Sequence, residues 1–104
     1  MVEVAGTEFQ QKLAASHAAY QAERDRQYDI YKFTCVREQG ARDRTLAALD
    51  PIDEAGRTVA HDAYDKEVSK ASKIYKRYEE RAWKKHMDEA AALRRQYGIP
   101  EEVL

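Results

Sequence analysis

Three histidines are the side chains of this sequence best suited to binding a metal, and their spacing decides whether they form a site. His86 precedes Glu89 by three residues and His61 precedes Asp65 by four, so each pair would share one face of a helix. Di-metal sites in helical bundles use Glu-x-x-His on two helices together with further carboxylates, and that order and duplication are absent. We therefore expect no metal and no cofactor, and we interpret His86 as a hydrogen-bonding residue between two helices.

The sequence supports nucleophilic catalysis no better than it supports metal binding. There is no phosphate-binding loop, no dinucleotide fingerprint and no Ser-His-Asp arrangement that the spacing would justify. Cys35 is interpreted as a small, buried apolar residue. A single cysteine cannot form an internal disulfide, which favours a reducing, cytoplasmic compartment. We expect a protein that is not an enzyme.

A basic segment is the second feature that could act on a partner. Residues 66–85 contain eight basic and three acidic side chains, hence +5 in a chain whose formal total is −1. A row of cations on the outer side of a helix can follow a phosphate backbone or meet an acidic protein. The alternative is a solvated helix face, with ordinary ion pairs Asp62–Lys66 and Glu80–Lys84. The residues expected in one line, named here the basic row, are Lys66, Lys70, Lys73, Arg77 and Lys84.

The elements that position these residues are expected to be helices. Four Gly and two Pro among 104 residues are too few for the turns of a sandwich or barrel. No apolar run approaches the roughly 20 residues that span a bilayer, and the first residues lack the pattern of a signal peptide. Residues 7–97 are rich in strong helix formers. We expect a single all-α domain covering residues 1–104.

Capping residues set the expected ends of the helices. Thr7 and Gln10 have the spacing of a capping box, and Asp50 before Pro51 is typical of a cap followed by a proline in the first turn. Gly98, with a proline two residues later, is typical of a helix end. Gly40 inside the first helix could bend or split it, but the apolar pattern continues in phase beyond it. The expected elements are a helix over about 7–49, a turn over 50–56, a helix over 57–97 and a flexible tail over 98–104.

The apolar residues of the two halves predict that the helices fold back on each other. With a turn centred near residue 53, facing residue numbers add up to 106, and apolar positions then coincide in both level and phase. We expect a long antiparallel two-helix hairpin, similar to a coiled coil, with a tyrosine-rich seam. The expected facing pairs include Phe9–Tyr97, Leu13–Leu93, Ser16–Ala90, Tyr20–His86, Tyr28–Tyr78, Tyr31–Tyr75, Cys35–Ala71, Arg42–Tyr64 and Leu46–Ala60.

Polar residues also fall on the seam, and two interpretations of them remain open. Arg24, Glu38 and Arg42 lie at seam positions, and the last two have the spacing of a helical ion pair. Such groups can fix the register of a narrow coiled coil. Alternatively, a partner helix covers them.

Apolar residues outside the seam predict a second interface. A lone hairpin buries one stripe per helix and would be marginally stable, so we expect it to dimerise into a four-helix bundle. An uncovered second interface predicts a self-associating adaptor, inhibitor or assembly factor that binds itself and an unidentified protein partner. The alternative is a protein that binds nucleic acid through the basic row. The candidate interface residues are Trp83, Met87, Phe33, Val36, Ile74 and Arg94.

A third possibility comes from a likeness in architecture. A helical hairpin of about this length, ending in Tyr97-Gly-Ile-Pro-Glu101, resembles the small secreted hairpin proteins that carry a Trp-x-Gly turn and a Tyr-x-x-x-acid tail signal. The turn of this chain, from Asp50 to Gly56, has no Trp. The resemblance therefore covers the architecture rather than the sequence, and it implies secretion only as a minor alternative.

Overall fold

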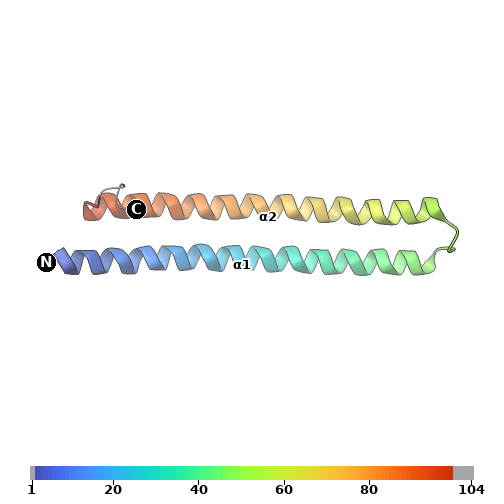
Figure 1. Ribbon diagram of the computed structural model, residues 1–104, viewed down its shortest axis with the longest axis horizontal. Coiled ribbons are helices and arrows are strands. Elements are labelled where there is room, and N and C mark those ends of the chain that lie inside the picture. Colours follow the sequence, from blue (N-terminus) through green and yellow to red (C-terminus); the bar gives the residue numbers. More distant parts are fainter. Residues whose placement is uncertain (1, 100–104) are drawn as a thin grey trace. The chain divides into compact units, whose positions relative to one another are not determined.

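Two helices account for almost all of the structure. The computed structural model describes residues 2–99, in which α1 spans Val2–Ala48 and α2 spans Glu54–Tyr97 (Figure 1). The helices run in opposite directions, and no strand occurs among the described residues. The predicted all-α antiparallel hairpin is thus confirmed. The tail from Pro100 to Leu104, including the last residue of the proposed tail signal, lies outside the described residues.

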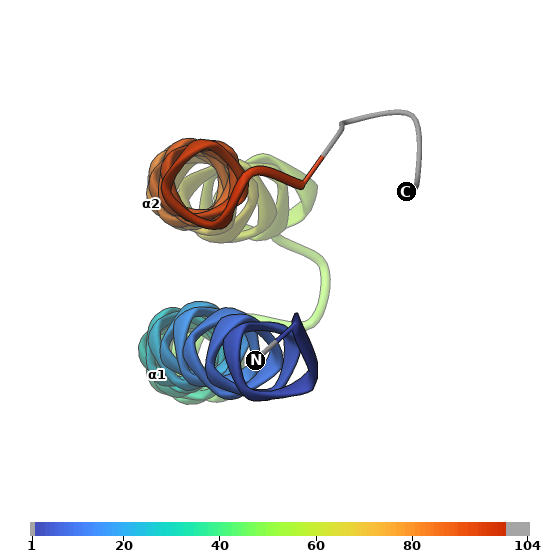
Figure 2. The ribbon, with the colours of Figure 1, turned by 90° about the vertical axis from the view of Figure 1, so that its left-hand side faces the viewer.

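The hairpin consists of two compact units. The terminal unit combines the beginning of α1, up to Arg26, with the end of α2, from Tyr78 on; in Figure 2 these are the helix ends nearest the viewer. The turn unit is the continuous stretch Gln27–Arg77, which contains the connection between the helices. Each unit therefore has one segment of α1 against one segment of α2, and each is described separately below.

The first helix begins earlier than predicted. α1 starts at Val2, so Thr7 lies inside the helix and is not its cap. The helix passes through Gly6 without interruption, and a Cβ added there would meet no atom within 4 Å. The helix also continues through Gly40, as expected from the seam pattern on both sides of it.

The N-terminus of α2 is capped by a different aspartate from the one predicted. The backbone N–H of Asp53 donates to the carbonyl of Asp50 at 2.9 Å, which closes a turn with Pro51 in its second position. The Asp50 carboxylate accepts from the N–H of Ile52 at 3.1 Å, within that turn. Asp53 caps α2 instead, because its Oδ1 accepts the N–H of Gly56 at 2.8 Å. As a result α2 begins at Glu54, three residues before its expected start.

The end of α2 follows the predicted chemistry. Gly98 has φ of +65°, a left-handed conformation that residues with a Cβ rarely adopt. The N–H of Ile99 donates to the carbonyl of Arg94 at 2.8 Å, and the N–H of Gly98 points to the carbonyl of Arg95 at 3.4 Å. This pair of bonds is the Schellman motif, which satisfies carbonyls at the end of a helix.

Both helices carry an eleven-residue repeat of cross-helix contacts. In the terminal unit the rings of Phe9 and Tyr97 lie 6.1 Å apart, and those of Tyr20 and His86 lie 5.9 Å apart and stacked. In the turn unit Tyr31 and Tyr75 are stacked at 5.8 Å, and the Arg42 guanidinium lies 4.5 Å from the centre of the Tyr64 ring. All four pairs match the predicted facing pairs. Successive members are eleven residues apart, at 9, 20, 31 and 42 in α1 and at 97, 86, 75 and 64 in α2.

This repeat keeps the seam on one side of each helix. Eleven residues in three turns correspond to about 3.67 residues per turn, close to the 3.6 of an undistorted α-helix. The fourth and seventh residues after each contact position complete the stripe on α1. These intervening residues are all buried or half-buried: Leu13, Ser16, Arg24, Gln27, Cys35, Glu38, Leu46 and, one residue past the end of α1, Leu49.

Two tyrosines predicted for the seam lie at its edge, and Tyr28 still contacts Tyr75 of α2, with the ring centres 5.7 Å apart. The residues of Tyr28 and Tyr78 are 46% and 41% exposed, whereas Gln27 is only 6% exposed. Counting from Tyr20 at about 100° per residue, position 27 lies about 20° from the seam centre and position 28 about 80° from it. Geometry therefore places the amide of Gln27 inside, although tyrosine is the more apolar residue.

The two helical glycines near the turn should respond in opposite ways to alanine. A Cβ added at Gly40 would have only an ordinary contact, 3.5 Å from Arg44, so Gly40→Ala should raise the free energy of unfolding by about 0.5–1 kcal/mol. A Cβ at Gly56 would lie 2.6 Å from Oδ2 of Asp53, the capping residue, so Gly56→Ala should give no such gain. Urea denaturation followed by circular dichroism measures both. A gain at Gly56 equal to that at Gly40 would contradict the capping arrangement.

Candidate functional site

A partly buried hydrogen-bond network joins the two helices of the terminal unit. The Ser16 hydroxyl donates to Oε2 of Glu89 at 2.6 Å and lies 2.8 Å from Nδ1 of His86. His86 is only 7% exposed, which makes it one of the two buried polar residues among those described. The predicted seam hydrogen bond of His86 therefore exists, with Ser16 as its partner, while Tyr20 stacks on the ring.

The direction of these bonds argues against an activated serine. A hydroxyl has one proton, and here Ser16 gives it to Glu89. Its oxygen can then only accept from His86, so Nδ1 of His86 must carry a proton. In a nucleophilic triad the imidazole instead takes the serine proton, and the acid contacts the other ring nitrogen. Ser16 thus acts as a hydrogen-bond bridge between the helices.

Aromatic side chains surround this network. The Trp83 ring lies 5.2 Å from Tyr20 in an edge-to-face arrangement and 5.7 Å from His86. The His17 ring lies 5.2 Å from His86. Edge-to-face and stacked pairs of this kind each contribute roughly 0.5–1.5 kcal/mol beyond the burial of their area. Trp83, predicted as an interface residue, is therefore also part of the packing of the terminal unit.

The outer end of the terminal unit is closed by contacts of Tyr97. Its hydroxyl donates to Oε2 of Glu8 at 3.1 Å, and the Lys12 ammonium lies 5.3 Å from the centre of its ring. The interaction with the Tyr97 side chain raises the pKa of Lys12, with a smaller contribution from the Glu8 carboxylate. These contacts anchor the last turn of α2 to the first turns of α1.

A shallow cavity beside the network is a candidate ligand site within the terminal unit. Its volume is about 330 Å³, and its walls include the tyrosines at positions 20 and 78. Its lining includes two basic residues, Arg81 and Lys85, and two acidic residues, Glu23 and Glu89. The formal charges of these four residues add up to zero.

A second cavity, named here the isoleucine groove, lies in the turn unit. Ile30 on α1 and Ile74 on α2 form its apolar walls, and both residues are 51% exposed. Its volume is about 240 Å³. The remaining lining residues are Gln27, Tyr31, Thr34, Arg37, Glu67, Lys70, Ala71 and Tyr75.

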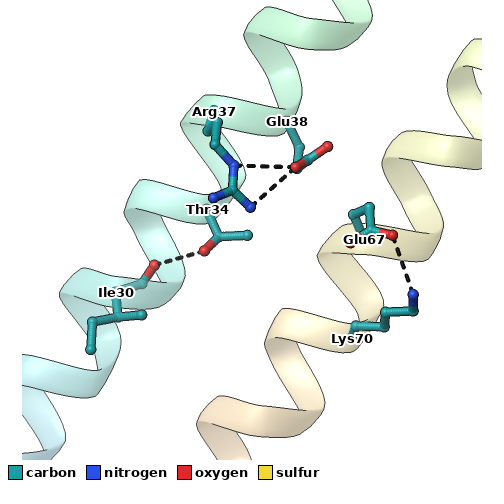
Figure 3. A network of polar contacts seen from close by, with 6 residues as sticks. All are labelled: Ile30, Thr34, Arg37, Glu38, Glu67 and Lys70. Atoms are coloured by element: carbon teal, nitrogen blue, oxygen red, sulfur yellow. Dashed lines mark hydrogen bonds and ion pairs between the residues drawn. The ribbon is translucent and has the colours of Figure 1, made fainter.

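Ion pairs at the edge of the isoleucine groove form within each helix. Arg37 pairs with Glu38 on α1 at 3.2 Å, and Lys70 pairs with Glu67 on α2 at 3.3 Å (Figure 3). The predicted Glu38–Arg42 pair is wrong: Arg42 instead stacks on the Tyr64 ring and lies 3.4 Å from Asp43.

The thiol of Cys35 forms a hydrogen bond with the Tyr31 side chain. Cys35 is free and half-buried, as its seam position predicts. A hydrogen bond with this thiol is the main cause that raises the pKa of Tyr31, and the charge of the thiolate adds to it. The geometry gives no further support for a reactive cysteine.

The predicted interface residues are placed in both units. Trp83, Met87 and Arg94 share one side of α2 in the terminal unit, where Trp83 is 46% exposed and the Nε atom of Arg94 is buried without a hydrogen-bond partner. The other three predicted interface residues, Phe33, Val36 and Ile74, belong to the turn unit. Phe33 and Val36 are 68% exposed, and Ile74 lines the isoleucine groove. The sequence analysis missed Ile30, whose spacing of three residues from Phe33 was the available signal.

The basic row is exposed throughout. Lys66, Lys70, Lys73 and Arg77 lie in the turn unit and Lys84 lies in the terminal unit. Only Lys70 of the five has an ion pair in the described part of the chain, and neither predicted pair, Asp62–Lys66 or Glu80–Lys84, forms there. The positive charge of the row is thus largely uncompensated.

Within residues 2–99, no three His, Cys, Asp or Glu side chains are grouped so as to hold a metal ion. The same region contains no helix that is both apolar and long enough to cross a bilayer. Comparisons with family models, curated proteins and solved structures find no match to this chain.

Proposed function

We propose that this chain is a non-enzymatic helical module for protein–protein interaction, which self-associates and serves as an adaptor, inhibitor or assembly factor. The observation that carries the proposal is its large exposed surface. The chain exposes 7935 Å². A compact globular monomer of this mass exposes about 6,000 Å². The difference, about 1,900 Å², is within the range that each subunit of an obligate homodimer buries.

The small interior supports the same conclusion. Among the described residues only Phe9, Ala60 and Ala90 are buried hydrophobic residues, and two of them are alanines. Burial of apolar area is the main favourable contribution to folding, at roughly 25 cal/mol per Å². A hairpin with so little enclosed apolar area gains much when a second layer of helices covers one of its faces.

The oligomeric state tests this proposal directly. We expect light scattering to give a mass of about twice 12.0 kDa at micromolar concentration, falling toward the monomer on dilution. The helical signal in circular dichroism should fall over the same range of concentrations, because the monomer has a small core. A mass of 12.0 kDa at all concentrations, with an undiminished helical signal, would contradict self-association.

The uncompensated basic row favours a second candidate function, the binding of nucleic acid. Lys66, Lys73, Arg77 and Lys84 have no ion-pair partner in the described residues, so their charge is available to phosphates. Titration with duplex and single-stranded DNA at low salt tests it, since binding should weaken steeply as salt rises. No binding tighter than about 10⁻⁵ M would end this alternative. An acidic protein partner would use the same row.

For the location of the chain we propose a reducing, cytoplasmic compartment. The support is the single free thiol of Cys35, which has no second cysteine to pair with. Secretion remains the minor alternative that the hairpin architecture suggests, and the appearance of the protein in culture supernatant would favour it.

A further inference from the structure

The two units differ in how much apolar surface they leave uncovered. Nine large hydrophobic residues are exposed among those described, and seven of them belong to the turn unit. The terminal unit has the Ser16 network and two of the three buried hydrophobic residues, whereas Ala60 is the turn unit's only one. The seven exposed residues of the turn unit are Tyr28, Ile30, Phe33, Val36, Ile52, Val59 and Ile74.

Within the turn unit, the isoleucine groove has the size and polarity to receive an aromatic side chain. Its volume is about 240 Å³. An apolar protein cavity of about 150 Å³ is large enough to bind benzene. Ile30 and Ile74 line the groove from different helices, and the small side chain of Ala71 also lines it. A phenyl ring placed there would cover apolar side chains on both sides.

The charged residues beside the groove are already paired, so they do not require a charged partner. Arg37 and Lys70 are each paired within their own helix, with Glu38 and Glu67 (Figure 3). The Thr34 hydroxyl donates to the backbone carbonyl of Ile30 at 3.1 Å and is therefore satisfied as a donor. An apolar group can enter without leaving these charges unpaired, which favours an aromatic residue over an acidic or basic one.

A matching aromatic residue stands beside the groove itself. Phe33 follows Ile30 by three residues on α1, about 60° around the helix, and is 68% exposed. Its neighbouring position on the same helix means that one patch of surface carries both a protruding ring and a groove that fits it. Such a patch is self-complementary, as a two-fold symmetric dimer requires: if residue i contacts residue j, then j contacts i.

We propose that a second copy of this chain occupies the isoleucine groove, with Phe33 of each copy inserted between Ile30 and Ile74 of the other. The inference rests on the proposed function and specifies its interface. A second copy is favoured over another protein because the ring and the groove lie on one patch, and because the excess exposed area matches what a homodimer buries. The turn unit is then the dimerisation element, and the terminal unit is held together by its own contacts.

A pair of matched substitutions tests the interface on the full chain. Val36 has the same exposure as Phe33, 68%, but lies about 120° around α1 from Ile30 and does not line the groove. Phe33→Glu should raise the dissociation constant of the dimer at least about 30-fold, as expected for a central aromatic residue. Val36→Glu should change it less than about threefold. Sedimentation analysis measures both constants, and circular dichroism at saturating concentration checks that both variants remain helical.

Disulfide trapping gives a second readout, which does not require that the Phe33→Glu variant stays folded. In a Cys35→Ser background, copies with Phe33→Cys mixed with copies with Ile74→Cys should form a mixed disulfide on mild oxidation. Copies with Val36→Cys mixed with the same Ile74→Cys copies should not. Equal trapping at positions 33 and 36 would overturn the proposed groove contact.

The outcomes separate the interface from the function on which it rests. A wild-type chain that is monomeric at all concentrations would overturn both the self-association and the groove interface. A wild-type dimer that tolerates Phe33→Glu but dissociates with Trp83→Glu would overturn only the groove interface. Loss of the dimer with Phe33→Glu, together with trapping between positions 33 and 74, would support the proposal.

Discussion

Alanine in place of Phe9 is expected to lower the free energy of unfolding by about 3 kcal/mol. Phe9 is 7% exposed and is the one large hydrophobic residue among those described that is buried. Its ring packs edge to face on Tyr97 at 6.1 Å, in the layer next to the Tyr97–Glu8 hydrogen bond. The substitution removes the ring and with it the aromatic contact of Tyr97, which keeps its contacts with Glu8 and Lys12. Urea denaturation followed by circular dichroism measures the loss, and a change below about 1 kcal/mol would show that this layer contributes little.

The same substitution at Phe33 is the matched control. Because Phe33 is 68% exposed, Phe33→Ala should change the stability of the dilute, monomeric chain by less than about 0.5 kcal/mol. At concentrations that favour the dimer, its effect should grow, since the ring is then buried between two copies. The effect of Phe9→Ala should be large at both concentrations. The two phenylalanines thus separate packing within the hairpin from packing between hairpins.

The hairpin could be predicted from the sequence because its pairing rule is simple. Residue numbers that add up to 106 predicted the contacts Phe9–Tyr97, Tyr20–His86, Tyr31–Tyr75 and Arg42–Tyr64, and all four occur. Each contact involves a large ring at a fixed level of an antiparallel pair, where helix geometry alone sets the neighbours. The Gly98 cap was predictable for a related reason, since a positive φ strongly favours glycine.

The cap of α2, the burial of Gln27 and the Ser16 network were not predicted. In each case several residues could take the same place, and the sequence does not show which of them does. Asp50 and Asp53 both have the chemistry of a cap, and Asp53 prevails because Asp50 and Pro51 are used in the turn before it. Gln27 occupies the seam because the eleven-residue repeat places it there, and the greater hydrophobicity of Tyr28 does not shift the register. The Ser16 network was missed because Glu89 lies beside the seam and reaches into it only through its side chain.

The position of polar residues on the seam connects the fold to the proposed function. Where a coiled coil would have leucines, this hairpin has Ser16, Gln27, Glu38 and Arg42, each with a local partner or partial access to water. Their predicted role in fixing the register of the two helices stays a prediction, and they contribute little burial of apolar area. Nine large hydrophobic residues among those described are nevertheless exposed, and seven of them lie in the turn unit. Such a distribution suits a helix pair that is stabilised when it associates.

Ser16→Ala is expected to lower the free energy of unfolding by about 1–3 kcal/mol, although alanine is the better helix former. Both hydrogen bonds of the Ser16 hydroxyl, to Glu89 and to His86, connect α1 to α2. Without the hydroxyl, Nδ1 of His86 loses its partner in a residue that is 7% exposed, and desolvation of that unpaired group is the main cost. Urea denaturation at a concentration that keeps the oligomeric state constant measures the effect.

Two further variants identify the cause. Ser69 is exposed and its hydroxyl has no hydrogen-bond partner among the described residues, so Ser69→Ala should stabilise the chain by a few tenths of a kcal/mol through helix propensity alone. His86→Leu in the Ser16→Ala background removes the unpaired imidazole, so the double variant should be destabilised by clearly less than the sum of the two single effects. If the single effects simply add, Ser16 and His86 act independently, and the network does not hold the helices of the terminal unit together.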